Sequence, residues 1–100
     1  MRRLREYAAR ELGSHPEVRE AILIGSLARG DWSARSDADV VVVVDESERS
    51  FRERSAAYAP RSHPGAPVDL LVYTKHEREA WRPRFRAEVE RGVVLYRRAA

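Results

Sequence analysis

The sequence predicts an α/β (α+β) domain, built on a mixed β-sheet that is flanked by helices. Four short apolar runs suited to strands alternate along the chain with segments of helical spacing. Aspartates stand at two of these runs, which predicts an acidic site at one edge of the sheet. One hundred residues suit one core, so we expect residues 1–100 to form a single domain.

The first element is predicted to be an amphipathic helix. Leu4, Tyr7, Ala8 and Leu12 recur at helical spacing and form one apolar stripe, and Gly13 is expected to end the helix. Its arginines are expected to face solvent. This is therefore a packing helix.

A strand over residues 18–24 and a tight turn are expected next. Gly25 lets the chain turn sharply, and Ser26 then opens a helical turn. The exposed N–H groups of such a turn, with the serine hydroxyl, favour an anion such as a triphosphate. Gly30 suits the left-handed residue that ends the turn, and Arg29 is a candidate contact for nucleotide phosphates.

Two aspartates introduce the second strand, about residues 39–44, whose five valines suit a central strand covered on both faces. Asp37 and Asp39 are two positions apart, so both carboxylates are expected on one face of the sheet. Two carboxylates about 5 Å apart repel by roughly 3 kcal/mol at an effective dielectric constant of about 20. Magnesium relieves this repulsion, and binds through one or two carboxylates with phosphates and waters completing its shell.

A third aspartate stands in the next predicted strand, residues 67–73. Asp69 is the only charge in this apolar run, and a lone buried carboxylate is unfavourable unless it is paired, protonated or bound to metal. If this strand lies beside the second, Asp69 joins Asp37 and Asp39 in a triad able to bind two metal ions or to act as a base.

The segment between these strands is predicted to hold a peripheral helix and a loop. The acidic residues Asp45, Glu46 and Glu48 suit the start of the helix. Phe51, Ser55 and Tyr58 would form its thin buried stripe. The proline-rich loop 60–67 is expected to shape one rim of the cleft.

Helical signals return after the third strand. Thr74 and Glu77 form a capping-box pattern, and Pro83 suits the first residue of a further helix that Gly92 ends. An apolar stripe accompanies these helices at Trp81, Phe85 and Val89. Residues 93–96 are expected to form the last strand.

Composition narrows the function classes. The chain is 35% charged and 43% hydrophobic, as in globular proteins, and its net charge of +3 is too small to indicate direct nucleic-acid binding. The absence of cysteine excludes disulfides, thiolate metal sites and a cysteine nucleophile. No stretch approaches the roughly 18 apolar residues of a membrane span, so we expect a cytoplasmic protein without a membrane partner.

The motifs resemble those of a known superfamily. Gly25-Ser26, ten intervening residues, Asp37-x-Asp39 and a later strand aspartate, Asp69, resemble the nucleotidyltransferase superfamily typified by DNA polymerase beta. The short chain and its Ala-Arg-Gly segment, residues 28–30, are similar to the minimal nucleotidyltransferases, or MNT domains. The resemblance covers roughly residues 21–96.

The resemblance implies a fold and an activity. The fold would be the polymerase-beta-like nucleotidyltransferase core, with helices on one side of the sheet and the site in an open cleft. The enzyme would use Mg²⁺, two ions in all, to move AMP from ATP to a hydroxyl acceptor. Asp37, Asp39 and Asp69 would be the catalytic residues and metal ligands, while Gly25 and Ser26 would hold the β- and γ-phosphates.

The resemblance also implies a partner. MNT proteins are commonly paired with a small helical HEPN ribonuclease toxin, and act as antitoxins by adenylylating one of its tyrosines. A hetero-oligomer is therefore expected. Two alternatives stay open: a non-catalytic binding module that neutralises a toxin, and a free-standing nucleotidyltransferase that acts on a small-molecule hydroxyl. The three clustered carboxylates argue against a pure binding module.

Overall fold

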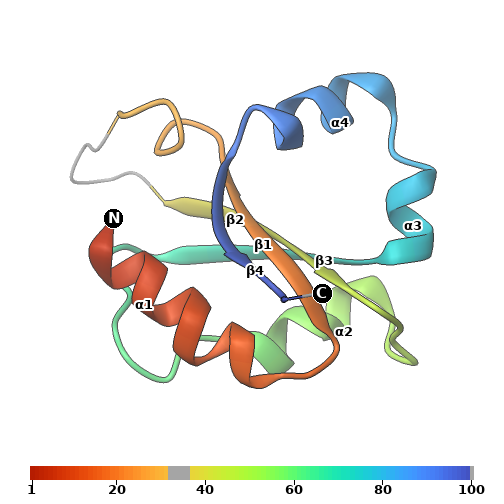
Figure 1. The fold of residues 1–100 in the computed structure, drawn as a ribbon, viewed down its shortest axis with the longest axis horizontal. Helices are drawn as coiled ribbons and strands as arrows, with labels where there is room; N and C mark the ends of the chain where they lie inside the picture. The colour runs from red at the N-terminus through yellow and green to blue at the C-terminus, as the bar shows by residue number, and fades with distance from the viewer. Residues whose placement is uncertain (32–36, 100) are drawn as a thin grey trace.

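A single mixed sheet forms the centre of the protein (Figure 1). The structure, a computed structural model, describes residues 1–31 and 37–99. In these residues the strand order is β3-β2-β1-β4, and the strands are β1 (Val18–Ile24), β2 (Ala38–Val44), β3 (Val68–Thr74) and β4 (Val93–Arg97). β1 runs antiparallel to β2 and β4, whereas β2 and β3 are parallel. The prediction of a mixed-sheet α+β fold is confirmed.

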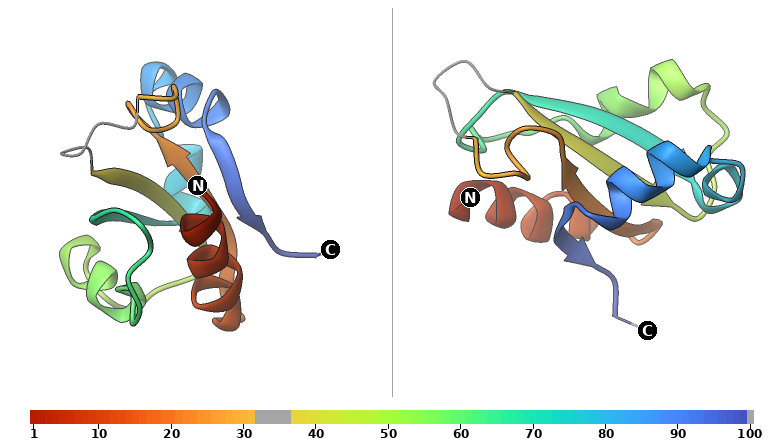
Figure 2. Two further views of the ribbon diagram at one scale, coloured as in Figure 1. Left: turned by 90° about the vertical axis from the view of Figure 1, so that its left-hand side faces the viewer. Right: turned by 90° about the horizontal axis from the view of Figure 1, so that it is seen from above.

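Short helices cover this sheet on both faces. They are α1 (Arg2–Arg10), the 3₁₀ helices η1 (Leu12–Ser14) and η2 (Ser55–Tyr58), α2 (Phe51–Arg54), α3 (Lys75–Glu79) and α4 (Pro83–Glu90). α4 lies above the sheet, and α1 and α2 lie below it, in Figure 1 and in the left view of Figure 2. Within the described part of the chain, no helix is long and apolar enough to cross a membrane.

The lower face holds the larger core. Even-numbered valines of β2 pack there with residues of β1, η2 and the first helical segment. The apolar stripe predicted for the first helix is buried there, as Leu4, Tyr7, Ala8 and Leu12. The hydroxyl of Tyr7 donates to the Tyr58 carbonyl oxygen at 2.7 Å, which ties α1 to η2 across this layer.

The upper face holds a second core. Val41 and Val43 of β2 pack there against Val89 of α4, with Trp81 and Phe85 at its edge. The apolar stripe of Trp81, Phe85 and Val89 therefore belongs to the hydrophobic core. The expectation of helices on one side of the sheet is wrong, because both faces of the valine-rich strand are apolar and each needs a covering layer.

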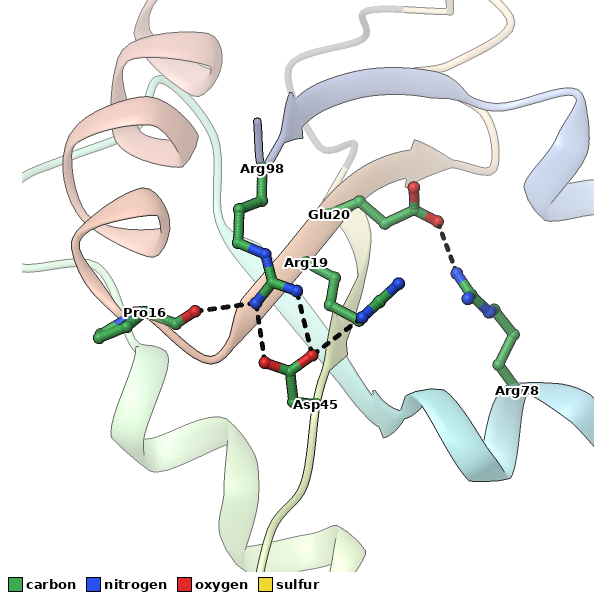
Figure 3. A network of polar contacts seen from close by, with 6 residues as sticks. All are labelled: Pro16, Arg19, Glu20, Asp45, Arg78 and Arg98. Carbon is green, nitrogen blue, oxygen red and sulfur yellow. Dashed lines mark hydrogen bonds and ion pairs between the residues drawn. The ribbon is translucent and has the colours of Figure 1, made fainter. Parts of the chain in front are cut away.

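The helix predicted to begin in the acidic segment 45–48 begins instead at Phe51. Asp45 does not start a helix. It follows β2, and its carboxylate accepts hydrogen bonds from Arg19 and Arg98 (Figure 3). These guanidinium groups lower the pKa of Asp45 to about 2. The network holds the chain end after β4 against β1 and β2.

The buried stripe predicted for that helix is also partly wrong. Tyr58 is buried, but Phe51 is 41% exposed, and the buried side chain of α2 is Arg54, at 7% exposure. Its guanidinium donates to the backbone carbonyls of Arg49 and Val72 and to the carboxylate of Glu77. A charged side chain can be buried here because its hydrogen bonds and its opposite charge are supplied.

Two local signals of the later chain are confirmed. The Thr74 hydroxyl accepts from the Glu77 backbone N–H at 3.1 Å, and the Glu77 carboxylate accepts from the Thr74 N–H at 2.9 Å, which completes the capping box of α3. Pro83 is the first residue of α4. Both helices lead the chain across the upper face and into β4.

Candidate active site

Asp39 and Asp69 face each other on neighbouring strands. They are paired in register between parallel β2 and β3, as Asp39 opposite Asp69. Because side chains alternate along a strand, Asp39 lies on the same face as Val41 and Val43, the face that α4 covers. The expectation that the strand of Asp69 lies beside that of Asp39 is confirmed.

The reason given for Asp69, however, is wrong. β3 is one of the two outermost strands of the sheet, so it is half-buried rather than enclosed, and Asp69 is exposed. Its charge is hydrated and does not need a compensating partner. Asp37 is exposed as well, immediately before β2. The site is consequently an open acidic edge and not a buried triad.

The surroundings of Asp39 raise the pKa of its carboxyl group. Partial burial raises its pKa, and the negative charges of Asp69, Asp37 and Glu88 raise it further. The three predicted aspartates therefore act on one another electrostatically. Glu88, which lies on α4, adds a fourth carboxylate that the sequence analysis did not identify.

The acidic edge can be tested for its fit to a cation. Among the described residues, no three acidic or histidine side chains converge closely enough to form a ready-made cation site. Magnesium does not need one, because one or two carboxylates suffice when phosphates and waters complete the shell. The oxygen ligands of Asp39 and Asp69 fit an ion of this kind. A site for two ions on all three aspartates stays a prediction.

Gly25 joins the turn after β1 to the acidic strands. Its φ of +79° lies in the left-handed region, and a Cβ on it would stand 2.9 Å from Asp39 Oδ2. Only glycine has both the conformation and the space for this close approach. Half-buried Ser26 follows at once, so the predicted phosphate residues and Asp39 belong to one small region.

The segment from Ser26 to Gly30 forms a hydrogen-bonded turn and not the start of a longer helix. The N–H of Arg29 donates to the carbonyls of Gly25 and Ser26, and the N–H of Asp31 donates to Ser26. Gly30 ends the turn with a φ of +90°, as predicted. With a single turn, any attraction for an anion comes from local N–H groups and side chains rather than from a helix dipole.

A pocket of about 320 Å³ opens between this turn and α4. On one side it is lined by Gly25 and Arg29, two of the predicted nucleotide-binding residues, and on the other by Arg84, Glu88 and Arg91. Arg84 and Glu88 of α4 and Arg91, the residue after its last turn, are spaced by four and three, so they lie along one side of the helix. The sequence shows this spacing, but it does not by itself indicate a binding site, because a charged helix face usually only contacts solvent.

Other predicted features lie elsewhere. The loop 60–67 packs mainly against the first helix region, where the N–H of Arg61 donates to Glu11 Oε1 at 2.6 Å. Its two ends reach the acidic edge: Pro60 lines a depression of about 190 Å³ together with Asp69, and the Pro67 carbonyl accepts from the N–H of Ala38 at 2.7 Å.

Known proteins resemble this chain in sequence and in fold. The family model for the nucleotidyltransferase domain matches residues 1–96. A crystal structure of a proposed nucleotidyltransferase from Sulfolobus solfataricus shares the fold, with a TM-score of 0.68 and 23% identity over 97% of this chain and 79% of that one. No curated protein sequence matches the chain. Since the family model spans almost the whole chain, this protein belongs to the nucleotidyltransferase domain family.

Proposed function

We propose that the protein transfers AMP from ATP to a hydroxyl acceptor. The observation that carries this proposal is the register of β2 and β3, which sets Asp39 opposite Asp69 with the Gly25 turn against Asp39. Transfer of a nucleotidyl group needs carboxylates beside a phosphate-binding turn, because the enzyme positions the triphosphate and neutralises its charge.

Each carboxylate has a proposed role. Asp37 and Asp39 would hold magnesium, which supplies positive charge for the triphosphate and the leaving group. Exposed Asp69 would take the proton of the acceptor hydroxyl while the oxygen of that hydroxyl bonds to the α-phosphorus. The bond from that phosphorus to the bridging oxygen then breaks, and pyrophosphate leaves. Ser26 and the N–H groups of its turn would hold the departing phosphates.

We further propose that the acceptor is a tyrosine of a HEPN-type ribonuclease partner, so that the protein acts as an antitoxin in a hetero-oligomer. The support is the MNT resemblance, together with the exposure of Asp69 on an outermost strand. A macromolecular hydroxyl can approach such an edge without opening the fold. A binding role without chemistry would leave Asp69 without a use, whereas a small-molecule acceptor would not need the edge of the sheet to be open.

The test follows label from ATP into an acceptor. The purified protein, Mg²⁺ and α-phosphate-labelled ATP are added to a lysate of the source organism, and labelled proteins are identified by mass. We expect one small labelled protein that carries AMP on a tyrosine. Asp39→Asn should abolish the label, whereas Asp31→Asn, which removes an exposed carboxylate from the nearby turn, should not.

The same experiment separates the alternatives. Label that enters only from γ-labelled ATP would indicate a kinase and would contradict the proposal. Label in a small molecule with no protein present would identify a free-standing enzyme. Neutralisation of a toxin by Asp39→Asn, without any label, would establish the binding module.

A further inference from the structure

We propose that Arg84 of α4 and Arg91, the residue that follows α4, bind the β- and γ-phosphates of the donor and the pyrophosphate product together with Arg29. This inference rests on the proposed nucleotidyl transfer and names the residues that recognise the leaving group. The three arginines line one pocket of about 320 Å³, and they come from elements that are far apart in the sequence.

The charge of the pocket favours a polyanion. Three guanidinium groups and one carboxylate, that of Glu88, are its charged lining groups among the described residues. Arginine binds phosphate through paired N–H donors, and three such forks match a ligand that carries several phosphate oxygens.

The arginines of the described residues divide into those that form ion pairs and those that form none. Within the described residues, the ion pairs of the chain use Arg2, Arg19, Arg54, Arg78, Arg97 and Arg98. In the same residues no ion pair involves Arg29, Arg84 or Arg91. Glu88 lies four positions from Arg84 and three from Arg91, yet neither arginine forms an ion pair with it. Their donors are consequently available to a ligand.

The position of the pocket matches a leaving group. Gly25 borders the pocket and also stands against the carboxylate of Asp39. A triphosphate whose α-phosphorus lies at Asp39 and Asp69 would therefore extend its outer phosphates past Gly25 toward α4. The described lining of the pocket contains no aromatic side chain on which a base could stack, which favours phosphate over adenine as the occupant.

Glu88 adds a condition to binding. Its carboxylate lies in the pocket wall and acts electrostatically on Asp39, so it repels a bare polyanion. A divalent cation that accompanies the phosphates removes this repulsion. We therefore expect Mg²⁺ to strengthen the binding of pyrophosphate to the protein.

The inference is tested by calorimetric titration of inorganic pyrophosphate, with and without Mg²⁺, into the whole protein. Arg84→Ala and Arg91→Ala should each weaken binding by about tenfold, the order expected when charge-assisted hydrogen bonds are lost. Arg82→Ala is the matched control, because it removes an exposed arginine next to α4 that does not line the pocket. Its affinity should stay within about twofold of wild type.

AMP is the second ligand, and its affinity should be unchanged in all three variants. Wild-type affinity for pyrophosphate in Arg84→Ala and Arg91→Ala would overturn the inference, as would a loss of AMP binding with pyrophosphate binding retained. Circular dichroism melting checks that each variant is folded. If wild type binds pyrophosphate through these arginines but transfers no label from ATP, this site stands and the proposed function fails.

Discussion

Gly25 is the residue at which the turn after β1 meets the acidic strands. Its hydrogen atom occupies the place where any other residue would carry a Cβ, against Asp39 Oδ2. The sequence predicts a sharp turn at this glycine, and its positive φ confirms it. Its contact with Asp39 was not predictable, because the distance depends on the pairing of β1 with β2.

Replacing two glycines separates these effects. Gly30 also has a positive φ, of +90°, but the space around its missing Cβ is empty to 4 Å. Gly30→Ala should therefore cost only the left-handed strain, about 1–2 kcal/mol of unfolding free energy. Gly25→Ala should cost more in urea unfolding and should also weaken nucleotide binding, because Asp39 must move. Equal losses of stability in the two variants would contradict the close approach.

Arg54 is the buried charge on which the packing of α2 depends. Arg54→Ala should lower the free energy of unfolding by about 2–4 kcal/mol, because the Val72 carbonyl and the Glu77 carboxylate lose a donor. Exposed Arg52 of the same helix is the control, and Arg52→Ala should change stability by less than about 0.5 kcal/mol. Urea unfolding at pH 7 measures both.

The loss in Arg54→Ala should also depend on pH. The hydrogen bond from Arg54 lowers the pKa of Glu77 in the folded protein. The stability from this pairing is therefore present above the pKa of an ordinary glutamate and is lost as the pH falls through the lowered value. The difference between wild type and Arg54→Ala should shrink below about pH 4. A difference that is constant from pH 7 to pH 3 would show that the ion pair contributes nothing.

At the scale of an element, the connection from α4 to β4 depends on a glycine, Gly92, that lies very close to β1. Gly92 was expected to end the helix, but its φ is not positive, and the helix ends at Glu90. What requires glycine is contact with β1, since a Cβ would stand 2.5 Å from Ile22 Cγ2 and 2.6 Å from the Leu23 carbonyl oxygen. The residue holds α4 close to the sheet.

Gly92→Ala should therefore displace α4 from β1. We expect a loss of about 2 kcal/mol or more in the free energy of unfolding, because backbone oxygen cannot yield as a flexible side chain does. The tryptophan fluorescence of the folded protein should shift too, since Trp81 packs at the edge of the core beside α4. Unchanged stability and fluorescence would show that the turn tolerates a methyl group.

The sequence pattern predicted correctly those elements that are determined by residues close to one another in the chain. The capping box at Thr74, the proline at the start of α4 and the strand at 18–24 all depend on neighbours within a few positions. The helix expected at 45–48 failed because Asp45 is held by arginines 26 and 53 positions away. Such partners are fixed by the tertiary fold and leave no periodic signal in the segment.

The candidate site divides in the same way. The spacing of Asp37, Asp39 and Asp69 indicated the acidic edge, because strand alternation sets which residues share a face. The residues on α4 were missed, since their approach to Gly25 requires the chain to cross the upper face and add β4 beside β1. The burial of Asp69 was predicted wrongly because sequence does not show which strand is outermost.

At the scale of the whole molecule, the acidic edge lowers stability. Burial and three nearby carboxylates raise the pKa of Asp39, so its charged form is less favourable in the folded protein than in the unfolded chain. At pH 7 Asp39 is ionised in both the folded and the unfolded protein, but only in the folded protein is it repelled by the nearby carboxylates. This penalty disappears as the pH falls through the raised pKa of Asp39.

Asp39→Asn should therefore raise the melting temperature at pH 7 while it abolishes nucleotidyl transfer, which is the usual opposition of stability and activity at a charged site. The gain should vanish near pH 3, where both proteins carry a neutral side chain at this position. Mg²⁺ with ATP should raise the melting temperature of wild type much more than that of Asp39→Asn. A lower melting temperature for Asp39→Asn at pH 7 would contradict this account.

The place of β3 at the border of the sheet has a consequence for how this family can diversify. On one side of Asp39 the chain itself builds the walls, from the turn and from α4. On the side of Asp69 the outermost strand has no neighbour in the described fold. On the proposed function, a lineage that retains the donor half can exchange one recipient for another by altering only what docks along β3, without rebuilding its core.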